Sequence, residues 1–239
     1  MHFKRLHTCC TVLKERAINV KGKKHSSNLW LARQMKDPYV EKSKQENYRC
    51  RSAFKLLEIN ERFNILYPGM VVVDCGAAPG SWTQVAVKLT NANGALNECP
   101  KGLVFSIDKR IFQSIEGAEI LGNSDFTHPD THNKLRLLLK ESLVDLVMSD
   151  MAPNATGVKK LDHDIIIDLS YSAMKFALQF SKPGSSFLTK LWDGEKTSQL
   201  QNDLMKFYKT VKFIRPKATR IDSTEQFLLA RDFKGLKSS

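Results

Sequence analysis

Acidic residues close several short apolar runs of this sequence, and a glycine-rich turn follows the first of them. The run Met70–Val73 ends at Asp74 and continues into residues 75–82, which read Cys-Gly-Ala-Ala-Pro-Gly-Ser-Trp. Later runs are followed by Asp108, Asp125 and Asp150. Glycine lets a backbone turn sharply and approach a ligand, and a carboxylate at a strand end can accept hydrogen bonds from ribose hydroxyls. This order of residue types favours a nucleoside site.

The turn after the first run lacks the sequences that bind phosphate groups. A P-loop needs G-x-x-x-x-G-K-[ST] and a dinucleotide fold needs G-x-G-x-x-G. Here Gly76 and Gly80 form G-x-x-x-G with Pro79 inside it. An adenosine held without a phosphate loop points to S-adenosylmethionine, with Asp108 on the ribose. Taken alone, the pattern leaves open an ordinary tight turn with solvated acids at the strand ends.

The elements that must position these residues alternate along the chain. Further runs typical of buried strands occur at 103–108, 143–150, 186–191, 211–214 and 227–230, and helix-like segments lie between several of them, at 81–89, 165–180 and 197–208. This alternation predicts an α/β domain with a mostly parallel central sheet and helices on both faces. The last two runs are too close for a helical crossover, so we expect a C-terminal antiparallel hairpin over 211–230.

Two helices are expected before the first strand. Pro38 suits the first turn of one helix, and Ser52 is predicted to cap the second. Lys55 then lies in a first turn, where the helix macrodipole disfavours a cation by roughly 0.3–1 kcal/mol. A lysine placed against this preference hints at a function, and an ordinary solvated lysine is the alternative.

The charge of the chain is positive and unevenly distributed. There are 37 Lys and Arg against 25 Asp and Glu, a net charge of +12, and residues 1–27 hold seven of these basic residues and a single Glu. This balance favours a polyanionic partner. Residues 1–27 favour a mitochondrial transit peptide, and so the mitochondrial matrix; a disordered basic arm that binds nucleic acid is the alternative. Residues 28–239 are then expected to form a single domain.

Cysteine and histidine usage argues against a disulfide framework and a metal site. The five cysteines are odd in number and form no C-x-x-C pair: Cys9, Cys10, Cys50, Cys75 and Cys99. His128, His132 and the run Asp162-His163-Asp164 resemble metal ligands, but we expect them to be loop and helix-start residues and expect no metal. No apolar run approaches the roughly 18 residues of a membrane span.

Five motifs occur in one order along the chain. They are R-S-A-F-K-L at 51–56, D-C-G-A-A-P-G-S-W at 74–82, S-D-M-A-P-N at 149–154, F-L-T-K at 187–190 and S-T-E at 223–225. Together they resemble the FtsJ/RrmJ family of RNA 2′-O-ribose methyltransferases over residues 27–232. The strings D-M-A-P-N-A-T-G at 150–157 and L-D-H-D at 161–164 most resemble the mitochondrial branch of that family, which methylates a uridine of large-subunit ribosomal RNA.

The resemblance implies a Rossmann-like S-adenosylmethionine-dependent methyltransferase fold. It places a catalytic tetrad on Lys55, Asp150, Lys190 and Glu225. It places cofactor contacts on Gly80, Trp82, Asp108, Asp125 and Asp150, and the same loop adds Gly76, Pro79 and Ser81. Lys190 is the expected base for a ribose hydroxyl, because partial burial or a nearby second ammonium lowers the pKa of a lysine. The two tetrad carboxylates are expected to hold the lysines by charged hydrogen bonds.

The expected partner is ribosomal RNA within a pre-ribosomal large-subunit particle. Arg49, Arg51, Lys217 and Arg220 are predicted to contact its phosphates, with an ordinary solvated surface as the alternative. Three other functions stay open. They are a nucleotide-dependent oxidoreductase, which the missing G-x-G-x-x-G disfavours, a ribosome-assembly factor with weak or no catalysis, and a 2′-O-methyltransferase of transfer RNA or an mRNA cap.

Overall fold

The computed structural model describes residues 36–153 and 156–236. The described residues from Pro38 onward form one compact unit. The predicted leader at 1–27 lies outside the described residues. Among the residues described, no helix is both long enough and apolar enough to span a membrane.

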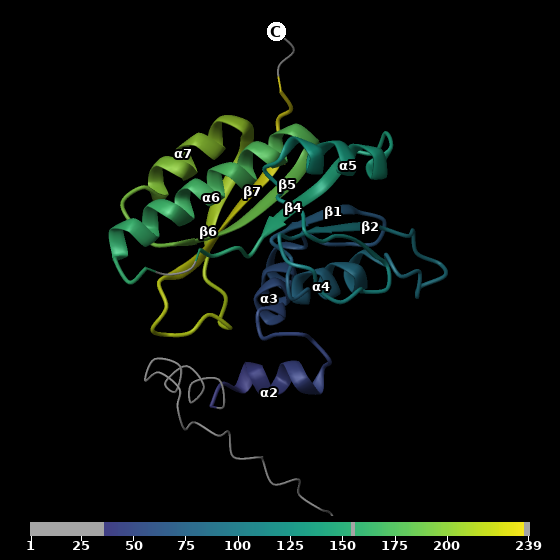
Figure 1. Ribbon diagram of the computed structural model, residues 1–239, viewed down its shortest axis with the longest axis horizontal. Coiled ribbons are helices and arrows are strands. Elements are labelled where there is room, and N and C mark those ends of the chain that lie inside the picture. Colours follow the sequence, from purple (N-terminus) through teal and green to yellow (C-terminus); the bar gives the residue numbers. More distant parts are fainter. Residues whose placement is uncertain (1–35, 154–155, 237–239) are drawn as a thin grey trace, which may run out of the picture. The chain divides into compact units, whose positions relative to one another are not determined.

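Seven strands form one sheet in the order β3-β2-β1-β4-β5-β7-β6 (Figure 1). They are β1 (Val71–Cys75), β2 (Leu103–Ile107), β3 (Ala118–Leu121), β4 (Val144–Ser149), β5 (Ser181–Trp192), β6 (Tyr208–Ile214) and β7 (Glu225–Phe233). The first five strands are parallel, and β7 is antiparallel to both β5 and β6. The predicted parallel sheet and C-terminal hairpin are confirmed, and β7 enters the sheet between β5 and β6.

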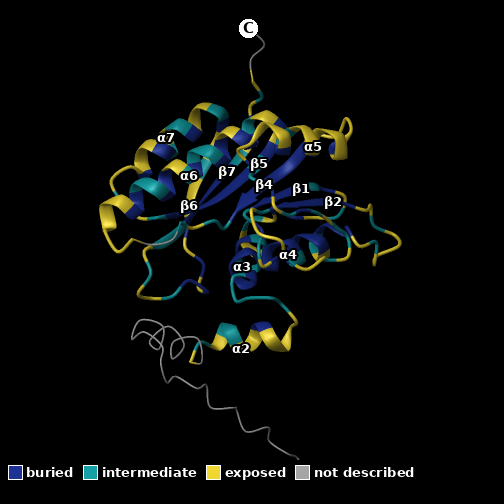
Figure 2. Ribbon diagram, viewed as in Figure 1, coloured by how far each residue is buried: buried dark blue, intermediate teal, exposed yellow. Residues whose placement is uncertain are grey.

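Helices cover both faces of the sheet, as predicted (Figure 1). They are α3 (Ala53–Phe63), α4 (Ser81–Thr90), α5 (Pro129–Leu139), α6 (Lys159–Phe180) and α7 (Thr197–Phe207). A further helix, α2 (Pro38–Gln45), precedes α3. Successive residues of a strand point to opposite faces, so Val72 packs with α3 and α4 while Val73 packs with α5, α6 and α7. Figure 2 shows the strands buried and the outer helix surfaces exposed.

The middle of the sheet holds a topological switch. β1 and β4 are neighbours, and the chain continues from β1 toward β2 and β3 but from β4 toward β5. Loops leaving two such strands diverge, and ligands of open α/β sheets bind beyond the strand carboxyl ends at this point. The register pairs Cys75 with Ser149 and Ser149 with Thr189. The residues that follow each of these therefore meet at one edge.

The prediction that Ser52 caps a helix is wrong, because its side chain makes no capping hydrogen bond. Ser52 precedes α3 as expected, but its backbone is already helical (φ −65°, ψ −19°) and its side chain makes no capping hydrogen bond. Its Oγ lies instead 2.8 Å from Ser81 Oγ and 3.1 Å from Cys50 Sγ. The serine therefore ties the start of α3 to the start of α4 rather than capping its own helix.

Candidate active site

Lys190 and Asp150 form the first of two buried ion pairs at this edge. Lys190 lies near the end of β5 with 8% of its surface exposed, and its Nζ is 2.9 Å from Asp150 Oδ1. The same ammonium donates to the main-chain carbonyl of Asp150. Because Ser149 pairs with Thr189, the register of β4 and β5 places these two residues side by side. The ammonium is thus held by both the side chain and the backbone of one aspartate.

Lys55 and Glu225 form the second pair. Lys55 lies in the first turn of α3 with 7% of its surface exposed, and its Nζ is 2.6 Å from Glu225 Oε1. Glu225 also accepts a hydrogen bond from Thr219 Oγ1 at 3.4 Å. No acidic residue occupies the first turn of α3, so Glu225 supplies the counter-charge that this turn lacks.

The direction of β7 brings Glu225 to this edge. Glu225 is the first residue of β7 and pairs with Trp192, the last residue of β5. In an antiparallel pair the start of one strand lies beside the end of the other. Glu225 therefore lies at the carboxyl edge of the parallel strands, and all four predicted tetrad residues occur there as two lysine–carboxylate pairs.

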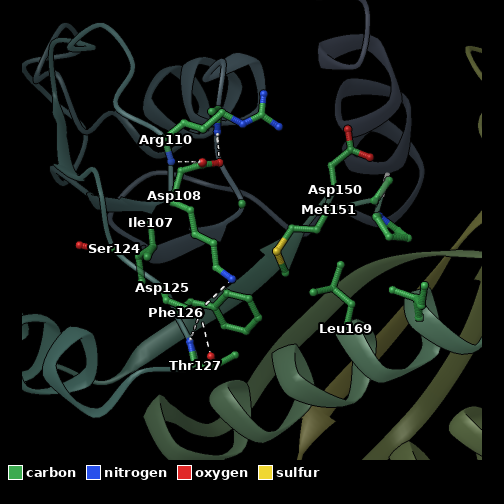
Figure 3. A pocket seen from close by; sticks show the side chains of 16 residues that line it. Ile107, Asp108, Arg110, Ser124, Asp125, Phe126, Thr127, Asp150, Met151 and Leu169 are labelled. Atoms are coloured by element: carbon green, nitrogen blue, oxygen red, sulfur yellow. Dashed lines mark hydrogen bonds and ion pairs between the residues drawn. The ribbon is translucent and has the colours of Figure 1, made fainter. Parts of the chain in front are cut away.

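A cavity of about 540 Å³ lies beside the tetrad, beyond the ends of β1, β2 and β4. Asp108, Asp125 and Asp150 all line it, together with the apolar side chains of Phe126, Met151, Ile165 and Leu169. Figure 3 shows Met151 and Leu169 on the wall opposite Asp108 and Asp125. A volume of this size and a few polar groups among apolar ones are typical of a small-molecule site.

The two acids of the cavity wall hold their own loops. Asp108 accepts from the backbone N–H groups of Ala78 at 2.8 Å and Arg110 at 2.7 Å. Asp125 accepts from the N–H of Thr127 at 3.0 Å and pairs with Lys109 at 2.9 Å. Burial raises the pKa of Asp125, but the hydrogen bonds from Thr127 and Lys109 outweigh it and lower the pKa overall. These contacts fix both carboxylates at the cavity wall, Asp125 as the anion.

A second, smaller cavity of about 190 Å³ shares Gly76, Ala78 and Asp150 with the first. Pro79, Ser81 and Trp82 line it together with Cys50, Ser52 and Asp74, and the contact of the first three with a cofactor stays a prediction. Trp82 is buried, and its Nε1 donates to the carbonyl of Ser52 at 3.0 Å. The two cavities lie on either side of the glycine turn, with Asp150 common to both.

The two glycines of the turn are required for different reasons. Gly76 has φ +74°, and a Cβ there would lie 2.0 Å from the Met151 side chain. Gly80 has φ +107°, and a Cβ there would lie 2.7 Å from Arg49 and Ile115. Gly76 lines both cavities, whereas Gly80 lines neither and instead begins α4. The prediction that Gly80 contacts the cofactor therefore stays a prediction, and its evident role is close packing.

Asp74 was not assigned a role from the sequence. It is 1% exposed and accepts from Thr83 Oγ1 at 2.8 Å, and Thr83 Oγ1 also lies 2.8 Å from Ser106 Oγ. Burial raises its pKa to about 7, and the nearby Asp150 and Asp108 carboxylates act in the same direction. The sequence did offer one sign that Asp74 is unusual, because it is an acid that follows an otherwise apolar run. What the sequence did not reveal is that Thr83 and Ser106 enclose it.

Arg49 and Arg51 were predicted to contact phosphates, but the structure uses both to join loops. Arg49 donates to the carbonyls of Pro79, Gln113 and Ser114 at 2.7–2.8 Å. Arg51 Nη2 donates to the carbonyl of Ala218 at 2.6 Å. A guanidinium carries five N–H donors in a rigid fork, which suits it to holding several carbonyls. The structure therefore gives both residues a structural role, and their predicted contact with RNA stays a prediction.

Lys217 and Arg220 lie between β6 and β7. Lys217 is exposed and Arg220 is half-buried. The loop that carries them ends at Glu225, so both cations lie within eight residues of a tetrad residue in the sequence. Their predicted contact with RNA stays a prediction.

The histidines act as the loop and helix-start residues that we expected. His128 caps α5 by accepting from the N–H of Asp130, and His132 Nε2 lies 2.7 Å from the carbonyl of Phe126. His163 accepts from the N–H of Lys196 at 3.1 Å. No group of three potential metal ligands occurs within 36–153 and 156–236. Over the same residues the cysteines, Cys50, Cys75 and Cys99, are free thiols.

The sheet order, the glycine turn and the acids at successive strand ends define a Rossmann-like methyltransferase domain. A family model described as FtsJ-like methyltransferase matches residues 48–233. The chain is 51% identical over 226 residues to "rRNA methyltransferase 2, mitochondrial" of Drosophila melanogaster, covering 95% of this chain and 90% of that protein. It is therefore a methyltransferase of the FtsJ-like family.

Other relatives agree with this assignment. "Ribosomal RNA large subunit methyltransferase E" of Cereibacter sphaeroides is 42% identical over 226 residues, or 95% of this chain and 92% of that protein. A crystal structure from Plasmodium falciparum, assigned as a ribosomal RNA methyltransferase, aligns with a TM-score of 0.70 and 26% identity. That alignment covers 79% of this chain and 100% of the other.

Proposed function

We propose that this protein transfers a methyl group from S-adenosylmethionine to the ribose 2′-hydroxyl of a uridine in mitochondrial large-subunit ribosomal RNA. The carrying observation is that two buried lysines each meet a carboxylate at one sheet edge, Lys190 with Asp150 and Lys55 with Glu225. Asp150 also lines the adjoining cavity. Asp150 therefore contacts the proposed base, Lys190, and also lines the space proposed for the methyl donor.

The residues of the larger cavity suit S-adenosylmethionine. Each carboxylate oxygen accepts more than one hydrogen bond, so the backbone contacts of Asp108 leave it able to bind ribose hydroxyls. Phe126, Met151 and Leu169 offer apolar surface for an adenine ring. When bound, the cofactor supplies an electrophilic methyl group carried on a sulfonium. Asp108, Asp125 and Asp150 would hold it at the strand ends.

The chain's own residues then have separate roles. Lys190 in its neutral form takes the proton of the ribose hydroxyl, which is otherwise a weak nucleophile. Asp150 orients the Lys190 amine through the contact seen between them. Lys55, fixed by Glu225, supplies a positive charge facing the oxygen as negative charge develops on it. Alignment of oxygen, methyl and sulfur in a closed site supplies much of the remaining rate.

The proposed substrate follows from the relatives and the charge. The names of the relatives are those of a mitochondrial rRNA methyltransferase and of a ribosomal RNA large subunit methyltransferase. The net charge of +12 suits a partner rich in phosphates. We therefore propose that the enzyme acts in the mitochondrial matrix, on RNA within a pre-ribosomal large-subunit particle, and that methylation supports assembly of that particle.

The test compares wild type with Lys190→Ala, using S-adenosylmethionine labelled on its methyl group. Naked mitochondrial large-subunit RNA and its precursor particle serve as alternative substrates, and the RNA is digested to nucleosides. We expect label in 2′-O-methyluridine with wild type and its loss in the variant. Label on a nucleobase would overturn the ribose assignment. Cofactor binding without label on RNA or particle would favour an assembly factor.

A further inference from the structure

The loop between β6 and β7 presents an apolar side chain among cations. Residues 215–224 contain Arg215, Lys217 and Arg220 against a single acid, Asp222. Ile221 at the tip is 99% exposed, the highest exposure among the exposed large hydrophobic side chains of the described residues. Single exposed apolar residues are ordinary on protein surfaces. This one needs an explanation because the loop that carries it is held in place from several sides.

Arg215 braces the tip from inside the loop. Its Nη2 donates to the carbonyls of Arg220 at 3.2 Å, Ile221 at 3.3 Å and Ser223 at 2.6 Å. One guanidinium thus binds three carbonyls in the second half of the loop, before β7. Such bracing fixes the backbone at the tip, so the Ile221 side chain is held outward rather than left to fold back onto the protein.

Helix α3 anchors the base of the loop. Glu58 accepts from the N–H groups of Lys217 at 2.6 Å and Ala218 at 3.1 Å. Arg51, just before α3, donates to the carbonyl of Ala218 at 2.6 Å. Hydrogen bonds to a charged group are stronger than those between neutral groups. Both polar groups of the Ala218 backbone are therefore bound to the element that carries Lys55.

The anchored loop is continuous with the tetrad. Thr219 Oγ1 donates to Glu225 at 3.4 Å, and the N–H of Glu225 donates to Ser223 Oγ at 3.1 Å. The carbonyl of Thr224 accepts from the N–H of Asp193, just beyond β5. A strand of RNA with its ribose at the tetrad must pass the residues that immediately precede Glu225. The loop is therefore placed to meet nucleotides next to the methylated one.

We infer that residues 215–224 form an RNA-binding loop in which Ile221 packs against a base neighbouring the methylated nucleotide and Lys217 contacts the backbone phosphates. Glu58 is a positioning residue that holds this loop against α3. The inference rests on the proposed function and adds the contact by which the substrate is held. Proteins insert apolar side chains against bases and contact phosphates with cations, and this loop supplies both. An RNA strand suits its charge better than a neutral protein surface.

Binding of a large-subunit RNA fragment, titrated over a range of salt, separates the two kinds of contact. We expect Ile221→Ala to weaken binding about 5-fold without changing the salt dependence, because it removes an apolar contact. Lys217→Ala should lower the slope of log affinity against log salt by about 1, because it removes a phosphate contact. Leu137→Ala is the matched control, since Leu137 is 79% exposed on α5. If Ile221→Ala binds like Leu137→Ala at every salt concentration, the inference is overturned.

Steady-state kinetics test the positioning role of Glu58. We expect Glu58→Ala to raise the KM for RNA about 5-fold and to leave the KM for S-adenosylmethionine unchanged, with partial rescue in Glu58→Gln, which keeps an acceptor. An equal rise in both KM values, or no rise, would contradict the role. Should Glu58→Ala fail to fold, the fully exposed Ile221 still decides the inference through binding. If wild type binds RNA but methylates no ribose, the proposed function fails while the binding comparison stands.

Discussion

Two sides of this site use carboxylates in different ways. The proposed cofactor side is the larger cavity with Asp108 and Asp125, and the tetrad side is the two lysine–carboxylate pairs. On the cofactor side, Asp108 and Asp125 accept hydrogen bonds from backbone N–H groups, some of them only two residues away. On the tetrad side, the carboxylates bind lysines that are distant in sequence, 40 residues apart for Asp150 and Lys190 and 170 for Lys55 and Glu225. The carboxylates of the cofactor side are held largely by their own loops, whereas the pairs of the tetrad side form only when the sheet has assembled.

The difference suggests separate tasks for the two sides. Backbone donors fix Asp108 and Asp125 and leave further lone pairs of their oxygens able to accept from hydroxyls and amines. A buried lysine–carboxylate pair fixes both partners, and breaking it leaves an uncompensated buried charge. We therefore expect substitutions on the tetrad side to affect the rate and those on the cofactor side to affect binding.

After loss of the Lys190 base, the largest effect is expected from the Lys55–Glu225 pair. Lys55→Ala and Glu225→Gln should each lower kcat by about 10²–10³-fold, and the double variant should be little worse, because residues that act as a unit lose their effect together. The measurement is single-turnover methyl transfer on saturated RNA. Losses that multiply in the double variant would show that the two residues act independently.

The next largest effect concerns Asp74, which lies between the two sides. Its pKa is raised from 3.8 to about 7, chiefly by burial. The folded protein therefore keeps a proton here that the unfolded chain releases. This contribution to stability is present in full below about pH 4 and is lost as the pH rises through about 7.

Asp74→Asn removes this titration. We expect the free energy of unfolding of the variant, relative to wild type, to rise by about 4 kcal/mol between about pH 4 and pH 8. Urea unfolding at several pH values measures it, and the comparison with wild type subtracts the titration of all other groups. A difference that stays constant with pH would mean that Asp74 is ionised in the folded protein throughout.

A smaller effect is expected at Asp108. Asp108→Ala leaves the N–H groups of Ala78 and Arg110 without their acceptor. We expect the affinity for S-adenosylmethionine to fall about 10-fold or more, by roughly 1–3 kcal/mol, while the rate at saturating cofactor changes little. Calorimetric titration measures the affinity, and kcat at high cofactor concentration measures the rate. A fall in kcat with unchanged affinity would reverse the division of tasks between the two sides.

The smallest effect is expected at Lys109. It pairs with Asp125 at 2.9 Å, but its side chain is 72% exposed. Exposed ion pairs contribute about 0–1 kcal/mol and are screened by salt. Lys109→Ala should therefore change cofactor affinity less than about 3-fold, and less still at high salt. A larger, salt-independent loss would indicate direct contact between Lys109 and the cofactor.

Much of the architecture could be predicted from local patterns. The apolar runs identified the strands and the alternation identified the α/β class, because buried parallel strands need no partner information to be recognised. The glycine turn and the acids at the strand ends were also visible, and Asp108, Asp125 and Asp150 do line one cavity. Motif resemblance supplied the four tetrad residues. No local pattern alone singled out Glu225.

Long-range contacts account for what the sequence left undecided. Arg49 and Arg51 looked like free cations, yet carbonyls of Pro79 and Ala218 occupy them. Ser52 looked like a helix cap but bonds to Ser81 instead. In each case the partner comes from another element, at least 29 residues away. The type of a side chain indicates what it is able to bind, but the fold decides which partner lies within hydrogen-bonding distance.

Most of the elements, their order and the chemical groups at the strand ends could be recognised from the residues alone. Which lysine pairs with which carboxylate depends on how those elements pack. Glu225 reaches Lys55 because β7 enters the sheet antiparallel to β5 and α3 packs over that face. Those two events depend on burying apolar surface across the whole domain. The residues around position 225 predicted a hairpin, but not that β7 would pair with β5.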